Sequence, residues 1–403
     1  MSKKDVLLIA NYWHMESEKA SSRYRTFADI LSTRYDLEVV TSTFCHLKKE
    51  QRKIEKLYLD ELPYKMTFCY EKGYDKNISL KRIRSYKEFG KNVYEYLKTR
   101  KKADVVIVSV PSLSVADYVT KFCQKNNIPV IVDIQDLWPE AFKMAIKMPV
   151  VSDVLFAPMM RQANRTYARA NVIMAVSDTY VARGKKCNPN AEELSIYIGT
   201  DEELVEKKTK GVVVDKPKDE FWVGYVGALG HSYDIKLVID GIKRLKEEKG
   251  IDNNVFKIMG DGVLRQEFEE YARNSGIRYE FTGLLEYGVM MKTLMSCDVG
   301  VNAIIGTSVS SIINKVADYA AAGVPVINTQ NCEEYRQLLV EYNCGISITS
   351  GDVHEFANAL WELYGNENKR LEMNKNARRL YDDKFNRRKR YPKLMNMIDS
   401  LLK

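Results

Sequence analysis

Long hydrophobic runs, paired cysteines and histidines are scarce in this 403-residue sequence. No window approaches 18 uninterrupted apolar residues, so we expect no transmembrane helix. The seven cysteines are odd in number, scattered and without a C-x-x-C pair, which argues against a disulfide framework or a zinc site and fits a reducing cytoplasm. Together with only four histidines they form no ligand cluster in the sequence, so we expect neither a metal nor another resident cofactor.

The remaining composition is that of a soluble globular protein, with 45% hydrophobic and 29% charged residues. The length is enough for two domains of ordinary size. The N-terminal run MSKKDVLLIANYW predicts a first strand, because its apolar part is too short for a signal peptide followed by a cleavage site. We therefore expect a cytoplasmic protein.

Positive charge is concentrated in one part of the chain. Residues 48–102 hold 17 Lys and Arg against 8 Asp and Glu, a net charge of +9, whereas the whole chain carries +8. No recognised nucleic-acid motif accompanies this basic block, so we expect no nucleic-acid partner. A solvated helical face and attraction to anionic lipid or a polyanionic acceptor both remain open.

Buried strands alternate with helical segments throughout, which predicts an α/β fold with parallel sheets. We expect an N-terminal domain over residues 1–205 and a C-terminal domain over 206–382, with a charged linker at 207–220. A terminal helix over about 383–403 is expected to pack back on the first domain. Ligands of such folds bind outside the carboxyl ends of the strands, here in a cleft between the two sheets.

The most informative segment is residues 308–329, SVSSIINKVADYAAAGVPVINT. It predicts a small-residue loop, a slim helix and a buried strand. Ser310 and Ser311 are candidate helix caps, Lys315 adds a cation in the first turn, and Asp318 adds a carboxylate one turn later. Free N–H groups at the helix start would bind an anion, and a phosphate attached to a hydroxylated sugar would suit the whole set. An ordinary capped helix after a strand is the alternative.

Two glycine-rich turns precede this segment. VGYVGALG at 223–230 and MGDGVLR at 259–265 each follow a predicted strand, and glycine lets the backbone approach a ligand closely. Arg265 then lies in a first helical turn, where it could contact phosphate. Plain tight turns explain both patterns equally well.

In the first half, the run DIQDLWPE at 133–140 places polar residues after a buried strand. A capped helix start explains it simply, with Asp136 as N-cap and Glu140 in the first turn. The segment at 142–160, FKMAIKMPVVSDVLFAPMM, predicts a core helix pair, and a membrane-touching lip is the alternative.

These motifs, in this order, resemble those of retaining, nucleotide-sugar-dependent glycosyltransferases of family 4, which have the GT-B fold. The resemblance implies two Rossmann-like domains, of which the first binds an acceptor and the second binds a nucleotide diphosphate sugar. A UDP-sugar is favoured as the donor. It also implies hexosyl transfer with retention at the anomeric carbon and without a metal. Helix N-termini and cations would stabilise the leaving diphosphate, and the donor phosphate itself would act as base.

Carried over position by position, the resemblance implies the following donor-binding residues: Gly227, Ala228, Gly230, Gly260, Arg265, Thr282, Gly283, Leu284, Ser310, Ser311, Ile312, Ile313, Asn314, Lys315 and Asp318. The sequence departs from the family at four of its positions. Ala228 and Tyr233 stand where an Arg and a Lys often hold the diphosphate. Ser310 replaces the first of two acidic residues, and Asp318 is a shorter version of the second.

The DLWPE run closely resembles that of transferases that build bacterial O-antigen and capsule, including N-acetyl-fucosamine transferases. It implies a lipid-linked saccharide acceptor. Because such an acceptor sits at an anionic membrane surface and the basic block lies in the same domain, we expect peripheral association with the inner face of the plasma membrane. Asp136 and Lys315 are then the catalytic candidates, and the acceptor candidates are Ser21, Ser22, Arg23, Trp138 and Glu140. Two other functions remain open: a sugar-nucleotide epimerase or hydrolase on the same fold, and a non-catalytic scaffold in a polysaccharide assembly complex.

Overall fold

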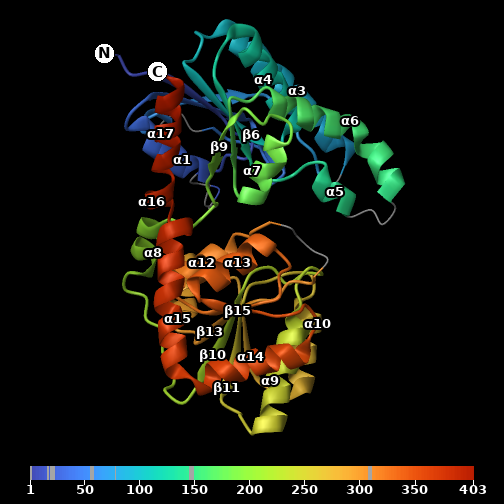
Figure 1. The fold of residues 1–403 in the computed structure, drawn as a ribbon, viewed down its shortest axis with the longest axis vertical. Coiled ribbons are helices and arrows are strands. Elements are labelled where there is room, and N and C mark those ends of the chain that lie inside the picture. Colours follow the sequence, from blue (N-terminus) through green and yellow to red (C-terminus); the bar gives the residue numbers. More distant parts are fainter. Residues whose placement is uncertain are drawn as a thin grey trace. The chain divides into compact units, whose positions relative to one another are not determined.

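The computed structural model describes residues 2–15, 18, 23–54, 59–77, 79–144, 149–306 and 311–403. The chain divides into two compact units (Figure 1). Unit 1 comprises Met1–Tyr197 with Tyr391–Lys403, and unit 2 comprises Ile198–Arg390. Each unit contains one parallel sheet with helices packed on it, so the predicted architecture of two Rossmann-like domains is confirmed.

The sheet of unit 1 has the strand order β5-β2-β1-β6-β7-β8-β9, and all neighbours are parallel. Its central strands read as continuous apolar runs, as in VVIVSV of β6, because helices cover both faces of a parallel sheet. The strands are β1 (Asp5–Ile9), β2 (Asp36–Ser42), β5 (Lys65–Cys69), β6 (Val105–Val110), β7 (Val130–Ile134), β8 (Val172–Ala175) and β9 (Glu192–Ser195), beside a small antiparallel pair, β3 (Phe44–Cys45) and β4 (Glu50–Gln51). The helices are α1 (Arg23–Ser32), α3 (Leu80–Thr99), α4 (Leu113–Asn126), α5 (Glu140–Met144), α6 (Pro149–Ala168), α7 (Asp178–Lys185) and α17 (Pro392–Leu401).

The sheet of unit 2 has the order β12-β11-β10-β13-β14-β15, again parallel. Its strands are β10 (Phe221–Val226), β11 (Asn254–Met259), β12 (Arg278–Gly283), β13 (Val299–Asn302), β14 (Val326–Asn328) and β15 (Gly345–Ser347). The helical segments are α8 (Glu202–Thr209), α9 (Ile235–Lys249), α10 (Arg265–Ser275), α11 (Tyr287–Met295), α12 (Lys315–Ala322), α13 (Glu333–Tyr342), α14 (Val353–Gly365), α15 (Glu367–Leu380), the π-helical turn η2 (Tyr381–Phe385) and α16 (Arg387–Arg390).

In both sheets the strand order reverses next to the first strand of the unit. The reversal lies between β1 and β6 in unit 1 and between β10 and β13 in unit 2. At such a point the connections leave toward opposite faces, and a crevice opens outside the carboxyl ends of the two strands. The loops after β10 and β13 are therefore the first place to look for a ligand in unit 2.

The boundaries between the units differ from those expected from the sequence. The chain passes into unit 2 at Ile198, earlier than the predicted 205/206 division, because α8 packs against α11 of that unit. The charged segment 207–220 is therefore not the interdomain linker. Of the terminal segment predicted over 383–403, only Tyr391–Lys403 belongs to unit 1.

The C-terminal helix α17 lies beside α1 in unit 1 (Figure 1). The rings of Phe27 and Tyr391 are 4.2 Å apart, and Leu394 and Ile398 are fully buried in the same core. The Tyr35 hydroxyl donates to Asp399 over 2.7 Å. Among the described residues, no helix combines the length and the apolar character that crossing a membrane requires.

Candidate functional site

Three glycines from three neighbouring strands pack together at the carboxyl edge of the second sheet. Gly227 follows β10 with φ of +138°, Gly260 follows β11, and Gly283 ends β12. A Cβ on Gly260 would stand 1.8 Å from the carbonyl oxygen of Gly227, so a side chain there is impossible without moving the loop. Gly260 also bridges to Gly283. Much of the glycine requirement thus comes from packing between the loops, and Gly227 has the backbone conformation that L side chains avoid.

Lys315, the first residue of α12, is a buried cationic residue of this unit. The residue is only 9% exposed, and its Nζ lies 4.2 Å from the ring centroids of both Tyr225 and Tyr233. Nζ has no hydrogen-bond partner among the described residues. It is 3.4 Å from the position that a Cβ on Gly227 would occupy, so it lies beside the loop after β10. Burial lowers the pKa of Lys315 to about 7.

The start of α12 differs from the prediction in one respect. Its N-cap is Asn314, without a side-chain cap, so Ser311 is not the capping residue. Ser311 is instead held through its carbonyl, which accepts a 2.6 Å hydrogen bond from the buried Gln330. Gln330 is fixed in turn by Asn302 at the end of β13. Ser310, the other predicted cap, lies outside the described residues. Lys315 begins α12, as predicted, whereas Asp318, expected one turn later, still lies in the first turn.

Tyrosines that the sequence analysis did not single out as ligand contacts organise this edge of the sheet. The Tyr319 hydroxyl accepts from the Val226 N–H over 3.1 Å and donates to the Val301 carbonyl over 2.7 Å, which ties β10 to β13. The Tyr225 hydroxyl donates to the Ala228 carbonyl over 2.7 Å and so fixes the glycine loop. Tyr233 stands where the family often has a lysine, and this departure from the pattern was the available signal.

Arg265, a predicted phosphate contact, is already bound to two carboxylates of the protein. Arg265 begins α10, as expected, but its Nε donates to Glu269 over 2.7 Å and its Nη1 lies 3.4 Å from Asp261. Its side chain is about one-third exposed, at 32%. It lies next to Gly283, whose added Cβ would be 3.0 Å from Nη1. Arg265 is thus at the right edge of the sheet, but two carboxylates already neutralise it.

The other predicted donor residues lie on the same loops with different exposure. Ala228 and Asn314 are exposed, Gly230 and Ile313 are half-buried, and Ile312 is buried. The Thr282 hydroxyl lies within hydrogen-bond distance of the Ile258 carbonyl, at 3.3 Å, and Leu284 is 83% exposed. Apart from its chain neighbours, no atom of the described residues lies within 4 Å of the position that a Cβ on Gly230 would occupy.

Asp318 is held by neighbours within unit 2. Its Oδ1 accepts from the Thr200 hydroxyl over 2.8 Å and from the Tyr287 hydroxyl over 3.1 Å. Burial raises the pKa of Asp318, and these hydrogen bonds offset part of the rise. The carboxylate therefore holds Thr200 and Tyr287 within the folded unit, and its contact with ribose stays a prediction.

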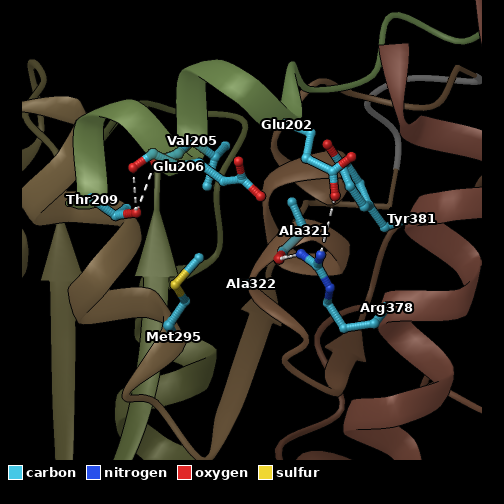
Figure 2. Close-up of a pocket in the computed structure, with 9 residues that line it drawn as sticks. All are labelled: Glu202, Val205, Glu206, Thr209, Met295, Ala321, Ala322, Arg378 and Tyr381. Carbon is cyan, nitrogen blue, oxygen red and sulfur yellow. Dashed lines mark hydrogen bonds and ion pairs between the residues drawn. The ribbon is translucent and has the colours of Figure 1, made fainter. Parts of the chain in front are cut away.

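A pocket of about 310 Å³ lies at the opposite end of α12, among α8, α11, α15 and η2 (Figure 2). Arg378 donates there to the carbonyl of Ala321 and pairs with Glu202 at 3.6 Å. Glu206 adds a second carboxylate to the lining, and the carbonyl end of a helix is itself negative. This pocket disfavours a diphosphate, in contrast to the Lys315 end of the same helix.

In unit 1, the DLWPE loop is built around an enclosed tryptophan. Trp138 is 6% exposed, and its Nε1 donates to Asp136 over 3.1 Å. The Arg82 guanidinium lies 4.5 Å from the Trp138 ring centroid and donates to the hydroxyls of Tyr86 and Tyr12 over 2.7 and 2.6 Å. Arg82 therefore fixes this loop and is not one of the freely solvated charges of the basic block.

Asp136 is not the N-cap of a helix, because α5 starts at Glu140. Its carboxylate faces Trp138 instead and is half-buried. Burial raises the pKa of Asp136, against the lowering effects of the Trp138 hydrogen bond and the Arg82 charge. Glu140 lies in the first turn of α5, as predicted, and is paired with Arg183.

Arg23 lies in the interior of unit 1. Its side chain is 2% exposed and its Nη2 is 3.6 Å from Asp133 Oδ1. The guanidinium also lies over the rings of Phe27 and Tyr391. Arg23 was expected to be an accessible contact for the acceptor, but it forms a buried ion pair instead. Ser21 and Ser22 lie outside the described residues.

The segment after the DLWPE loop exposes apolar side chains. Phe142 packs on Trp138 at 4.6 Å, but Val154 and Leu155 on α6 are 73% and 60% exposed. Residues 145–148 lie outside the described part. The core-helix interpretation accordingly fails at Val154 and Leu155. Within the described residues, no three His, Cys, Asp or Glu side chains gather as a metal site would require.

One family model matches the chain. Residues 220–366, which make up most of unit 2, match the family described as glycosyl transferases group 1. The match spans the loops after β10, β11, β12 and β13 and therefore includes the surroundings of Lys315. No curated protein matches the sequence significantly.

Solved structures resemble the whole chain at low sequence identity. HepE from Anabaena in complex with UDP is 15% identical, with a TM-score of 0.67 over 98% of this chain and 100% of that one. Sucrose-phosphate synthase from Thermosynechococcus elongatus is 13% identical, with a TM-score of 0.69 over 99% of both chains. WaaG, a glycosyltransferase involved in lipopolysaccharide biosynthesis, is 16% identical, with a TM-score of 0.60 over 98% and 99%. These likenesses confirm the predicted GT-B fold.

Proposed function

We propose that this protein, a glycosyltransferase of GT-B fold whose residues 220–366 form a group 1 glycosyl transferase domain, moves a hexosyl group from a UDP-sugar to a lipid-linked saccharide in bacterial surface polysaccharide synthesis, with retention. The observation that carries the proposal is the buried Nζ of Lys315, which has no hydrogen-bond partner among the described residues. It lies at a helix N-terminus beside the glycine loop of β10, where a diphosphate would supply the missing counter-charge.

The chemistry asked of this site is stabilisation of a leaving diphosphate. As the bond to the anomeric carbon breaks, negative charge grows on the β-phosphate. The Lys315 ammonium would meet that charge, assisted by the positive end of the α12 dipole, and no metal is called for. The Val316 and Ala317 amides already donate to the carbonyls of Ile313 and Asn314. In a front-face reaction the departing phosphate oxygen accepts the proton of the acceptor hydroxyl, so a separate general base is not required for retention.

Two features of related structures support UDP and a lipid-linked acceptor. HepE has been solved with UDP and with UDP-glucose, and WaaG acts in lipopolysaccharide biosynthesis. In this chain Asp318 is assigned to the ribose hydroxyls, which would have to exchange with its bonds to Thr200 and Tyr287. Arg265 reaches the diphosphate only by leaving Glu269 and Asp261, so it is the weaker of the two cationic candidates.

The acceptor is assigned to unit 1 and its DLWPE loop. Asp136 is a half-buried carboxylate that accepts a hydrogen bond from Trp138, whose ring is covered in turn by Arg82. We assign Asp136 to the acceptor hydroxyl. Trp138 shapes the loop from within, because its ring is covered by Arg82 and stacked on Tyr86.

Peripheral attachment to the inner face of the plasma membrane is assigned to unit 1 as well. One stripe of α3 is exposed and combines apolar with basic side chains, namely Leu80, Ile83, Arg84, Lys87 and Lys91. Val154 and Leu155 of α6 add exposed apolar surface. A basic helix with exposed apolar residues is typical of contact with anionic lipid.

The decisive experiment is a panel of UDP-, GDP- and dTDP-sugars tested for binding by calorimetry, followed by NMR of the product formed on a lipid-linked saccharide. We expect UDP-sugars to bind best and the product to keep the anomeric configuration of the donor. Turnover of donor without acceptor would favour the epimerase or hydrolase. Absence of binding by every nucleotide sugar would favour the scaffold and refute the proposal.

A further inference from the structure

Lys315 is a buried cation for which the described residues of unit 2 supply no counter-charge. Among the described residues, the titratable side chains found against it are Tyr225 from β10 and Tyr233 from the loop after β10. Burial lowers its pKa, and its Nζ has no hydrogen-bond partner among the described residues. The nearest carboxylate in the sequence, Asp318, is bound to Thr200 and Tyr287. Residues 307–310 are Thr, Ser, Val and Ser, none of which is ionisable.

Two tyrosine rings keep the amine dry and hold it in place. With Nζ 4.2 Å from both centroids, the rings occupy space where water would otherwise solvate an ammonium. Ring faces attract a cation, but this attraction is smaller than the loss of hydration in a buried site. The neutral amine is therefore favoured far more than in solvent, and the missing partner is an anion beside Gly227.

We propose that binding of the donor diphosphate is coupled to uptake of one proton from solvent by Lys315 Nζ, with Tyr225 and Tyr233 as the positioning residues that keep this amine dehydrated until the anion arrives. The inference rests on the proposed function, since it requires the diphosphate to bind here. The neutral amine takes a proton from the buffer and becomes an ammonium that donates to the phosphate oxygens. When the diphosphate leaves, the proton returns to solvent.

This coupling makes donor affinity depend on pH in one direction. Above neutral pH the free site lacks the proton and the occupied site has it, so affinity falls as pH rises, by up to tenfold per pH unit. Below neutral pH the free site is already protonated, and the dependence disappears.

The test is calorimetric titration of the full chain with UDP between pH 7.5 and 9. This range lies above the second phosphate pKa of about 6, so the ligand keeps its charge. At each pH the titration is repeated in two buffers of different ionisation enthalpy, which gives the number of protons taken up. We expect uptake approaching one proton at pH 8.5 and a Kd that rises nearly tenfold per unit.

Two variants isolate Lys315. Lys315→Arg places a permanently charged group at the site and should bind UDP without proton uptake and with a flat pH profile. Should Arg prevent folding, Lys315→Met serves instead, with weaker binding and again no uptake. Wild-type binding of UDP with no proton uptake, or uptake that persists in Lys315→Met, would overturn the inference while leaving the proposed function intact. Absence of binding by UDP, GDP and ADP throughout the pH range would overturn both.

Discussion

Replacing Lys315 by methionine should stabilise the ligand-free protein, although it removes the residue assigned to the donor. Methionine has a similar length, carries no charge and packs well in irregular apolar space. The wild-type lysine is 9% exposed and has no hydrogen-bond partner within the described part of the chain. Below pH 7 the folded wild type must bury an ammonium that has no counter-ion among the described residues, and the variant need not.

The pH dependence of this difference has a definite sign. The pKa of Lys315 is about 7 in the folded protein against 10.5 ordinarily. Between these values the unfolded chain binds a proton that the folded chain lacks, so the free energy of unfolding of the wild type rises with pH. At about 1.4 kcal/mol per unit, the advantage of Lys315→Met should shrink by about 3 kcal/mol between pH 6 and pH 9. Below pH 7 it should level off at its largest value.

Urea unfolding followed by circular dichroism, at intervals from pH 6 to 9, measures this difference. Subtracting the variant from the wild type at each pH cancels the titration of all other groups. Lys375→Met is the matched control, because Lys375 is exposed on α15 of the same unit, and its effect should not change with pH. An effect of Lys315→Met that is equally flat across the range would refute the claim that Lys315 is held neutral.

Further predictions address the donor, the metal and the membrane. Lys315→Ala should weaken UDP binding by about 1.5–3 kcal/mol, the range for charge-assisted hydrogen bonds, and Arg265→Ala should weaken it less. Calorimetry measures both losses of affinity, and a larger loss for Arg265→Ala would reject our assignment. Asp318→Asn should lose donor affinity whereas Asp318→Glu largely keeps it, and a 2′,3′-dideoxy donor that binds normally would contradict the ribose contact. Turnover should survive EDTA; loss with EDTA and recovery with Mg²⁺ or Mn²⁺ would overturn this. Replacing Arg84, Lys87 and Lys91 of α3 by glutamate should weaken binding to anionic vesicles at low salt by about 1 kcal/mol per reversed charge. The control is the same reversal at Lys207, Lys208 and Lys210 in unit 2, which should have no effect.

The fold was predictable because its signals are local. Continuous apolar runs such as β6 identify strands of a covered parallel sheet, and Gly323 ends α12 with φ of +69°. The unit boundaries were not predictable in the same way. A charged segment at 207–220 has the composition of a linker, but the chain crosses at Ile198 because α8 finds its packing partner α11 in unit 2.

Within the site, the sequence identified the first-turn position of Lys315 but not its environment. The burial of Nζ depends on Tyr225 and Tyr233, which are distant in sequence and indistinguishable by type from other core tyrosines. Likewise, nothing in the basic run around Arg82 reveals that this one guanidinium turns inward to cover Trp138. Charge counting treats every arginine alike, whereas the structure separates those that hold a loop from those that face solvent.

The contrast between Lys315 and two cations of unit 1, the buried Arg23 and the half-buried Arg82, indicates which of the three is reserved for a ligand. Arg23 is equally hidden, but it faces Asp133 and two aromatic rings, so its charge is compensated in the folded protein. Arg82 donates to two tyrosine hydroxyls and a backbone carbonyl. Among these three and within the described residues, Lys315 is the one with neither an ion-pair partner nor a hydrogen-bond acceptor. A group that lowers stability persists when it serves function, and what Lys315 lacks among the described residues is an anion that can approach Gly227 and the start of α12.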